Sequence, residues 1–206
     1  MTRYDGQDRY VDAVTGVLRN RLGIRDPEDL RQAEASLAAW RSFELALEPL
    51  PGSLDFAHLQ ALHARLFGDL YDWAGQVRDV EIAKGSCRFA GCRHIPAAAE
   101  AIFEQLAREG HLQGLGAEAF AARAGHYLGE INALHPFRDG NGRTQREFIG
   151  MLARQNGWRI AWEKVDAAEM IEASKASLLH GDNSGLARII RDNLRPLPQG
   201  APDSPA

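Results

Sequence analysis

The chain has 206 residues, of which 45% are hydrophobic and 25% charged, and its formal net charge is −4. This composition is typical of one globular domain, and the acidic balance gives no general attraction to nucleic acid or anionic membranes. Only two cysteines are present, the first residues carry no continuous apolar run, and no stretch approaches the roughly 20 apolar residues of a membrane span. We therefore expect a cytoplasmic protein with no signal peptide, no membrane anchor and no direct contact with nucleic acid.

The first predicted helix covers residues 26–48. Asp26 is its expected N-cap and Pro27 its first residue, the usual order at a helix start. Its apolar side chains recur at helical spacing, which predicts a buried face formed by Leu30, Leu37, Trp40 and Leu47. A second helix is expected over residues 54–67, with Ser53 as its N-cap.

The next region breaks the helical pattern. Residues 76–91 alternate between apolar and charged side chains, and Gly85 with Ser86 gives a turn signal, so a single β-hairpin is predicted here. Helical patterns then return over residues 96–110, 118–135, 142–157, 166–181 and 185–194. The expected fold class is mainly α with one β-hairpin. We expect a single domain over residues 1–195 and a disordered, proline-rich tail over residues 196–206.

A short segment between two predicted helices holds an unusual mixture of side chains. It reads HPFRDGNGR and covers residues 135–143. Pro136 disfavours helical geometry at His135, so one helix should end there. The run from Gly140 to Gly142 leads into the next helix, whose free N–H groups and positive dipole end suit a phosphate group. The segment is therefore predicted to be an anion-binding loop.

The side chains of this segment suit the same ligand. Arg143 and Arg146 lie three residues apart on one helix face, from which they can grip phosphate oxygens. Asp139 is a hard oxygen ligand, suited to Mg²⁺ held by one carboxylate and by phosphate oxygens. Asn141 can donate a hydrogen bond to a phosphoryl oxygen. His135 can accept a proton near neutral pH, so it is the candidate general base.

The longer run HPFRDGNGRTQR resembles the signature of the Fic (filamentation induced by cAMP) family, and residues 66–85 resemble the segment that leads into that family's β-hairpin flap. The resemblance covers about residues 54–160. It implies the Fic fold, a helical bundle with one β-hairpin flap beside the active-site loop. It also implies a protein adenylyltransferase, which moves AMP from ATP to a tyrosine, serine or threonine hydroxyl of a target protein.

The resemblance further implies a role for each residue of the motif. His135 would be the catalytic base, Asp139 would hold Mg²⁺ between ATP phosphates, and the loop would be shaped by Pro136 and held by Phe137. The phosphates would be received by Gly140, Asn141, Gly142, Arg143 and Arg146. Because a hairpin edge can accept an added strand, the target is expected to dock on the flap residues Val80, Ile82 and Lys84.

Many Fic proteins carry an inhibitory helix with the pattern (Ser/Thr)-x-x-x-Glu-(Gly/Asn), whose glutamate pairs with the second arginine of the motif. Here the only glutamate followed by Gly or Asn is Glu109, and Gln105 stands where Ser or Thr is required. The resemblance therefore implies a stand-alone, toxin-like member of the class I type. Its expected partner is a small helical antitoxin that supplies a glutamate near Arg146, and its expected targets are DNA gyrase and topoisomerase IV.

Two alternatives stay open at this point. One is a Fic-fold transferase with another donor, which would be UTP, CDP-choline or ATP used as a phosphate donor. Gly142 favours AMP transfer, because phosphate-donor members usually have Lys at that position. The other alternative is a catalytically silent Fic-fold binding module, which the intact motif disfavours. The target, the modified residue, the base preference and the oligomeric state stay open as well.

Overall fold

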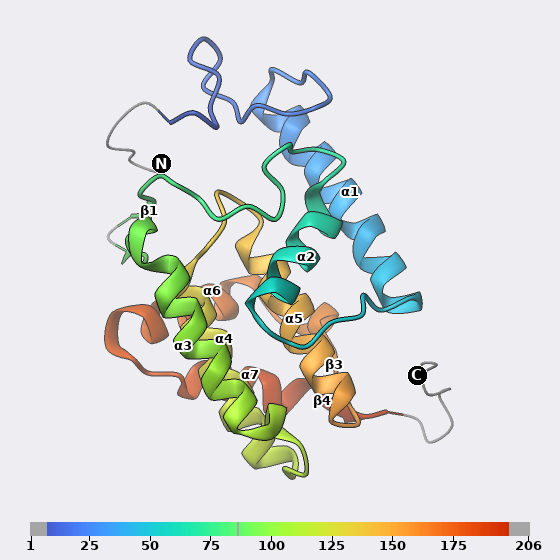
Figure 1. Cartoon of the computed structure of the whole chain (residues 1–206). Helices are drawn as coiled ribbons and strands as arrows, with labels where there is room; N and C mark the ends of the chain where they lie inside the picture. The colour runs from blue at the N-terminus through green and yellow to red at the C-terminus, as the bar shows by residue number, and fades with distance from the viewer. Residues whose placement is uncertain (1–7, 86, 198–206) are drawn as a thin grey trace.

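The structure is a computed structural model that describes residues 8–85 and 87–197. It is a bundle of helices with two small sheets (Figure 1). None of the helices in the described ranges is long and apolar enough to cross a membrane. The main helices are α1 (Pro27–Leu47), α2 (Phe56–Phe67), α3 (Ile95–Arg108), α4 (Ala117–Leu134), α5 (Asn141–Gln155), α6 (Ala167–His180) and α7 (Ser184–Asn193). Short 3-10 turns are η1 (Cys92–His94), η2 (Gly110–Leu112) and η3 (Trp162–Lys164).

Helix α4 lies at the centre of the bundle. Its neighbours are α3, α5, α6 and α7, and its buried side chains include Phe120, Tyr127 and Ile131. Gly125 permits the close approach of α7, because a Cβ there would lie 2.7 Å from the backbone of Ala187. The C-terminal end of α4 is thereby fixed in the core, and the motif begins at that end.

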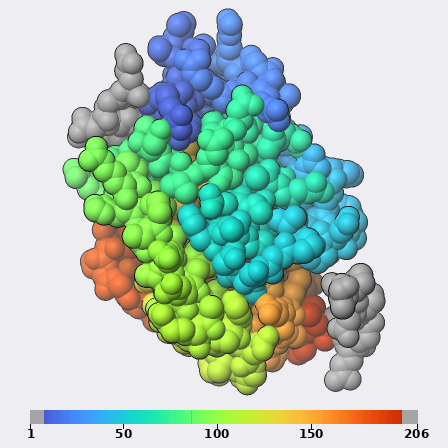
Figure 2. Space-filling model, in the orientation of Figure 1, coloured from blue at the N-terminus to red at the C-terminus, as the bar shows by residue number. Residues whose placement is uncertain are grey.

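Helix α5 carries the second half of the motif and is covered by α2, on which α1 packs in turn. In the space-filling view, α2 and α3 cover much of the near face (Figure 2). The buried face of α2 comprises His58, Leu59, Leu62, His63, Leu66 and Phe67. Apolar side chains from α2 and α5 therefore form a rigid base beneath the motif.

The predicted start of the first helix is confirmed, but that of the second is wrong. The carboxylate of Asp26 accepts hydrogen bonds from the N–H groups of Glu28 and Asp29, as expected of an N-cap. The second helix is capped by Asp55, whose side chain accepts from His58 N, and not by Ser53. The reason is local, because Leu54 adopts a left-handed conformation with φ of 53° and the chain is not yet helical there.

The predicted apolar face of α1 is only partly correct. The helix buries Leu30, Ala38 and Leu45, whereas Trp40 is 58% exposed and Leu47 is 72% exposed. Helix α1 lies at the edge of the bundle and contacts it through α2, so a narrow stripe is all that it can bury.

The predicted hairpin exists, but it is much shorter than residues 76–91. Strand β1 (Ala83–Lys84) pairs antiparallel with β2 (Cys87–Arg88), and Ser86 of the expected turn lies outside the described residues. We use the name flap for residues 80–90. Ile82 is 7% exposed and Val80 packs against the core. Both residues precede strand β1, and neither has a side chain that is free to contact a target. The alternation reflected an extended segment lying on the helices, and of the three predicted docking residues only Lys84 is exposed.

A second small sheet was not predicted. Strand β3 (Trp158–Ile160) pairs antiparallel with β4 (Leu194–Pro196), and Leu197 N–H donates to Gly157 O at 2.9 Å. The predicted hairpin is therefore one of two small sheets in the described chain, and Pro196 of the predicted tail lies in strand β4. Proline fits here because it is the last residue of a strand in a two-stranded sheet. The rest of the predicted tail, residues 198–206, lies outside the described residues.

Candidate active site

The motif starts with a backbone reversal at His135. This residue is the C-cap of α4 and adopts a left-handed conformation, with φ of 45° and ψ of 61°, while its N–H still donates to Ile131 O. A residue other than glycine pays about 1–2 kcal/mol for that conformation. Strain of this kind persists only where surrounding contacts fix the backbone, which is common at functional sites.

The carboxamide of Asn141 closes the loop. Its Oδ1 accepts from Phe137 N–H at 2.9 Å, and its Nδ2 donates to Phe137 O at 2.8 Å. The side chain is 2% exposed, so both of its polar ends are occupied within the protein. These bonds shape the loop, and the second N–H of the carboxamide is not used in them. The role of Asn141 towards a phosphoryl oxygen stays a prediction, and its own backbone N–H lies in the first turn of α5.

A buried histidine that was not singled out from the sequence supports the same loop. His63 of α2 donates from Nε2 to Asp139 O at 2.9 Å, and its Nδ1 accepts from Gly75 N–H at 2.8 Å. Its ring stacks on Phe137, with ring centroids 3.9 Å apart. Phe137 is 1% exposed, as expected of a residue that holds the loop. The available signal was the position of His63 within the apolar stripe of α2, where a polar side chain needs partners.

The start of α5 presents free N–H groups. Gly140 precedes the helix with φ of 75°, and a Cβ there would lie 2.5 Å from the buried ring of Phe67. Thr144 N–H donates to Gly140 O, so the N–H groups of residues 141–143 stay available at the helix end. The N–H of Gly140 itself donates to Asp139 Oδ1 at 2.7 Å. The free N–H groups that would suit an anion are thus those of the residues after Gly140.

His135 is buried, and its imidazole is neutral. Its side chain stacks on Phe89 of the flap, with centroids 3.7 Å apart, and Nδ1 lies 3.2 Å from Asn132 O. A protonated Nδ1 donates to that carbonyl, which leaves the lone pair on Nε2. Burial, followed by the nearby charge of Lys84, lowers the pKa of His135 to about 3. The imidazole is therefore neutral at physiological pH and can accept a proton.

The two motif arginines have different surroundings. Arg143 forms an ion pair with Glu34 of α1, and its guanidinium lies 4.7 Å from the ring centroid of Phe67. Glu34 also accepts a hydrogen bond of 2.5 Å from the hydroxyl of Tyr71. Arg146, in contrast, makes no hydrogen bond or ion pair with any residue of the described chain, and it lines the cavity beside His135. Its guanidinium is therefore available to an anion from outside.

Two further charged contacts bear on the predictions. Glu109, the single near match to an inhibitory pattern, pairs with Arg123 at 2.5 Å. It is therefore engaged on α3 and α4 and not at the motif. Arg138, to which the motif assigns no role, is 8% exposed and pairs with Asp8 at 2.8 Å. The N-terminal segment is thereby joined to the loop.

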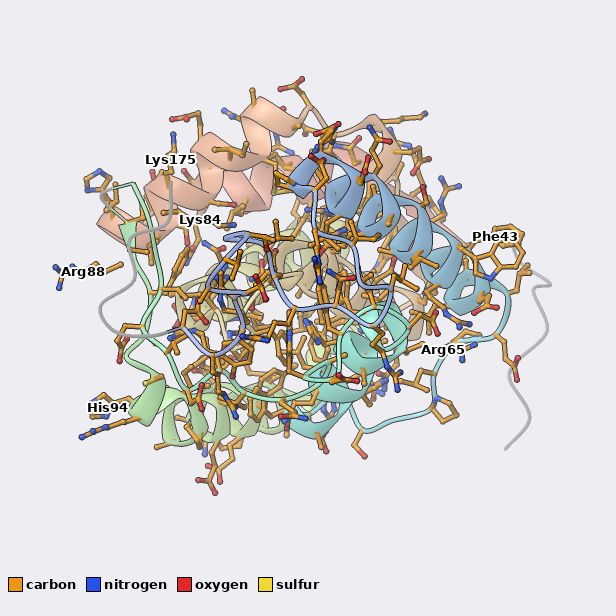
Figure 3. The ribbon with its side chains drawn as sticks, turned by 90° about the horizontal axis from the view of Figure 1, so that it is seen from above. Phe43, Arg65, Lys84, Arg88, His94 and Lys175 are labelled. Atoms are coloured by element: carbon orange, nitrogen blue, oxygen red, sulfur yellow. The ribbon has the colours of Figure 1, made fainter. Side chains whose placement is uncertain are left out.

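A cavity of about 320 Å³ opens between the flap, α4, α5 and α6. His135 and Arg146 line it, and so do Lys84, Met170 and Ser174 among others. Figure 3 shows Lys84 of β1 and Lys175 of α6 on the same side of the molecule, and both line this cavity. Its volume suits a nucleotide-sized ligand. The contribution of α6 to the cavity was not predicted, because nothing in its sequence distinguishes a helix that lines a cavity from one that does not.

The residues around Asp139 suit a metal that also binds phosphate. One of its carboxylate oxygens accepts from Gly140 N–H, and the side chain is only half-buried, so the other oxygen stays open. Within the described residues, no group of three or more His, Cys, Asp or Glu side chains could hold a metal by itself. A single carboxylate beside an anion-binding helix end fits Mg²⁺, which takes most of its ligands from water and phosphate.

Comparisons with known proteins agree with this arrangement. A family model described as the Fic/DOC family matches residues 53–153. Protein adenylyltransferase VbhT of Bartonella schoenbuchensis is 48% identical over 94% of this chain, which spans only 41% of that longer relative. A probable protein adenylyltransferase Fic of Salmonella typhimurium is 38% identical over 91% of this chain and 92% of its own length.

Solved structures show the same fold. The N-terminal Fic domain of a Bartonella quintana cell filamentation protein, crystallised with ADP, superposes with a TM-score of 0.85 and 29% identity, covering 92% of this chain and 95% of that one. BepC of Bartonella tribocorum, with AMPPNP, gives a TM-score of 0.84 and 25% identity, covering 91% of this chain and 96% of that one. By the motif, the fold and full-length relatives, this chain belongs to the Fic/DOC family.

Proposed function

We propose that this protein is a protein adenylyltransferase, which transfers AMP from ATP to a hydroxyl group of a target protein. The observation that carries the proposal is the neutral, buried imidazole of His135, which lines a cavity together with Gly142 and Arg146 at the start of α5. The relatives from B. schoenbuchensis and S. typhimurium are named as protein adenylyltransferases, and solved relatives were crystallised with ADP or AMPPNP.

The chemistry follows from the positions of the groups. Nε2 of His135 accepts the proton of a tyrosine, serine or threonine hydroxyl, whose oxygen attacks the α-phosphorus of ATP. The bond from that phosphorus to the oxygen bridging it to the β-phosphate breaks, and pyrophosphate leaves. The N–H groups at the start of α5, together with Arg143 and Arg146, stabilise the charge on the phosphates. The cavity between the flap and α6 would take the nucleoside.

Mg²⁺ belongs to this proposal through Asp139, whose open carboxylate oxygen would hold the ion. When bound, the ion neutralises charge on the α- and β-phosphates. Two hydrogen bonds keep Asp139 in place. Its carboxylate accepts from Gly140 N–H, and its main-chain carbonyl accepts from His63. The chain therefore orients this carboxylate before any ligand arrives, and no reorganisation of the loop is needed.

The flap is the proposed docking element for the target. Strands β1 and β2 pair only with each other in the described chain, so each has a free edge to which an extended segment can add. Lys84 is exposed beside this edge, and Phe89 extends from the flap to the ring of His135. Val80 and Ile82 would serve as inner anchors of the flap. A target hydroxyl held along this edge would then lie near Nε2.

The proposed setting is a toxin–antitoxin pair in the cytoplasm, where ATP and Mg²⁺ are present together. Arg146 has no acidic partner in the described chain, which is the condition for control by a glutamate from a separate helical antitoxin. DNA gyrase and topoisomerase IV are the first targets to test. UTP, CDP-choline and ATP as a phosphate donor are the alternative donor chemistries, and the same experiment distinguishes them by the mass added.

The test is mass spectrometry of a bacterial lysate treated with the purified protein, ATP and Mg²⁺. We expect an added AMP on Tyr, Ser or Thr of a target protein, and its loss with His135→Ala. His126→Ala is the matched control, because it removes a histidine of α4 that does not line the cavity. Calorimetric titration should show that His135→Ala still binds ATP. An added phosphate or another nucleotide would overturn AMP transfer, and the absence of any modification by a protein that binds ATP would favour the silent binding module.

A further inference from the structure

A fully buried arginine lies between the flap and the motif. The side chain of Arg78, in the segment between α2 and the flap, has an exposed fraction of 0%. A buried guanidinium loses much of its hydration and needs several acceptors in return. The acceptors here are main-chain carbonyl groups, with one carboxylate, that of Glu81, 3.9 Å away. The positions of those carbonyls suggest what the residue does.

The guanidinium of Arg78 joins three separate pieces of backbone. Nη1 donates to Val80 O at 2.7 Å and Nη2 donates to Ala90 O at 2.5 Å. Val80 and Ala90 are the two ends of the flap. Nε donates to His135 O at 2.8 Å. One side chain therefore binds both ends of the flap and the backbone of the catalytic histidine.

Main-chain hydrogen bonds run alongside those of the side chain. Arg78 N–H donates to Pro136 O at 2.9 Å, and Ala90 N–H donates to Ala133 O, also at 2.9 Å. The bonds to His135 O and Pro136 O fall on the residue in the left-handed conformation and on the residue after it. These are the peptide groups that must be fixed if a strained backbone is to persist.

We propose that Arg78 is a positioning residue, which fixes the flap and the His135 backbone as one unit. A hydroxyl docked on the flap would then keep a fixed distance from Nε2 of His135. This inference rests on the proposed function for its consequence in the reaction. The bonding pattern also explains why an arginine is needed. Its planar fork has five N–H donors, whereas lysine offers one ammonium that cannot span three carbonyls in different directions.

The decisive variant is Arg78→Lys, which keeps a charge but loses the fork. We expect the rate of label transfer from fluorescent ATP to lysate proteins to fall by roughly 10–100-fold, because small displacements of reacting groups have effects of this size. The KM for ATP should rise by a smaller factor than the rate falls, since Arg78 does not touch the start of α5 and acts on the nucleoside cavity only through the flap that lines it. Arg123→Lys is the control, because Arg123 pairs with Glu109 away from the motif.

Hydrogen exchange tests the same inference without any activity. In Arg78→Lys, the N–H of Ala90 should lose protection while that of Ile131 in α4 keeps it. The ¹⁵N shifts of the His135 ring should also move towards a mixture of tautomers. A variant that transfers label at the unaltered rate, or that loses ATP binding and not turnover, overturns the proposal.

Two outcomes need a further measurement. If Arg78→Lys does not fold, hydrogen exchange is measured on the unaltered protein instead. Protection of Ala90 N–H equal to that of Ile131 supports the proposal, and exchange as fast as that of Lys84 overturns it. If the unaltered protein transfers no AMP, the proposed function fails, while the exchange pattern and the tautomer of His135 still test the role of Arg78.

Discussion

Two buried histidines should make the stability of this protein fall as the pH is lowered. Burial lowers the pKa of His135 to about 3 and that of His63 to about 4, from the ordinary value of 6.5. An unfolded chain takes up a proton on each imidazole near pH 6.5, whereas the folded chain keeps both neutral. The unfolded state therefore binds more protons between these values, and stability is lost as the pH falls below about 6.5.

The size of the loss can be worked out from linkage. At about pH 5, roughly one and a half pH units below the unfolded value, each histidine destabilises the fold by about 2 kcal/mol. The two together give about 4 kcal/mol, which is a large share of the roughly 5–15 kcal/mol that keeps a domain folded. The pKa of His58 is also lowered by burial, which adds in the same direction. Below the folded pKa values the loss levels off.

Urea denaturation, followed by tryptophan fluorescence at about pH 7.5 and about pH 5, measures the effect. His135→Gln should remove about 2 kcal/mol of the pH-dependent loss, because it removes one of the two imidazoles. His94 is exposed next to the start of α3, so His94→Ala is the matched control and should keep the loss. A free energy of unfolding that differs by less than about 1 kcal/mol between the two pH values would refute the reasoning.

Three substitutions around the motif have separate expected outcomes. Gly140→Ala should lower the free energy of unfolding in urea by about 2 kcal/mol or more, because alanine disfavours a φ of 75° and its Cβ would meet Phe67. Arg146→Ala should weaken ATP binding in calorimetry by roughly 10–100-fold at unchanged melting temperature, since only the charged contact to phosphate is lost. Phe89→Ala should slow AMP transfer, because the ring stacks on His135 and also lines the cavity that would take the nucleoside. An unchanged rate in the last variant would show that the stacking does not position the imidazole.

The helices and the motif loop could be predicted because their signals are local. Pro136 ends one helix, and the glycine run opens the next, which begins at Asn141 as expected to within one residue. Asp26 acts as a cap through its own neighbours in the chain. Each of these depends on residues a few positions apart, so one sequence is enough to find them.

The features that could not be predicted depend on contacts between distant residues. The burial of Ile82 is decided by the helices on which the flap lies, and strand β4 forms because it meets β3, which lies more than thirty residues earlier in the chain. The side chain of Asn141 is of a type that can donate a hydrogen bond to a phosphate, and only the fold shows that it also bonds the loop that contains it. Arg78 appears in the sequence as one more charged residue in an alternating segment, and only the fold shows its carbonyl partners.

The acids that contact the motif from the N-terminal side have a practical consequence. Asp8 pairs with Arg138 and Glu34 pairs with Arg143, yet both acids precede the matched region that begins at residue 53. A shortened chain limited to that region would keep every letter of the motif and lose two carboxylates beside it. Chimeras that exchange the N-terminal segment between relatives would likewise change the charge around Arg143 with the motif untouched. The strength of phosphate binding can therefore differ between relatives that share the motif, because it also depends on acidic residues that lie N-terminal to the motif.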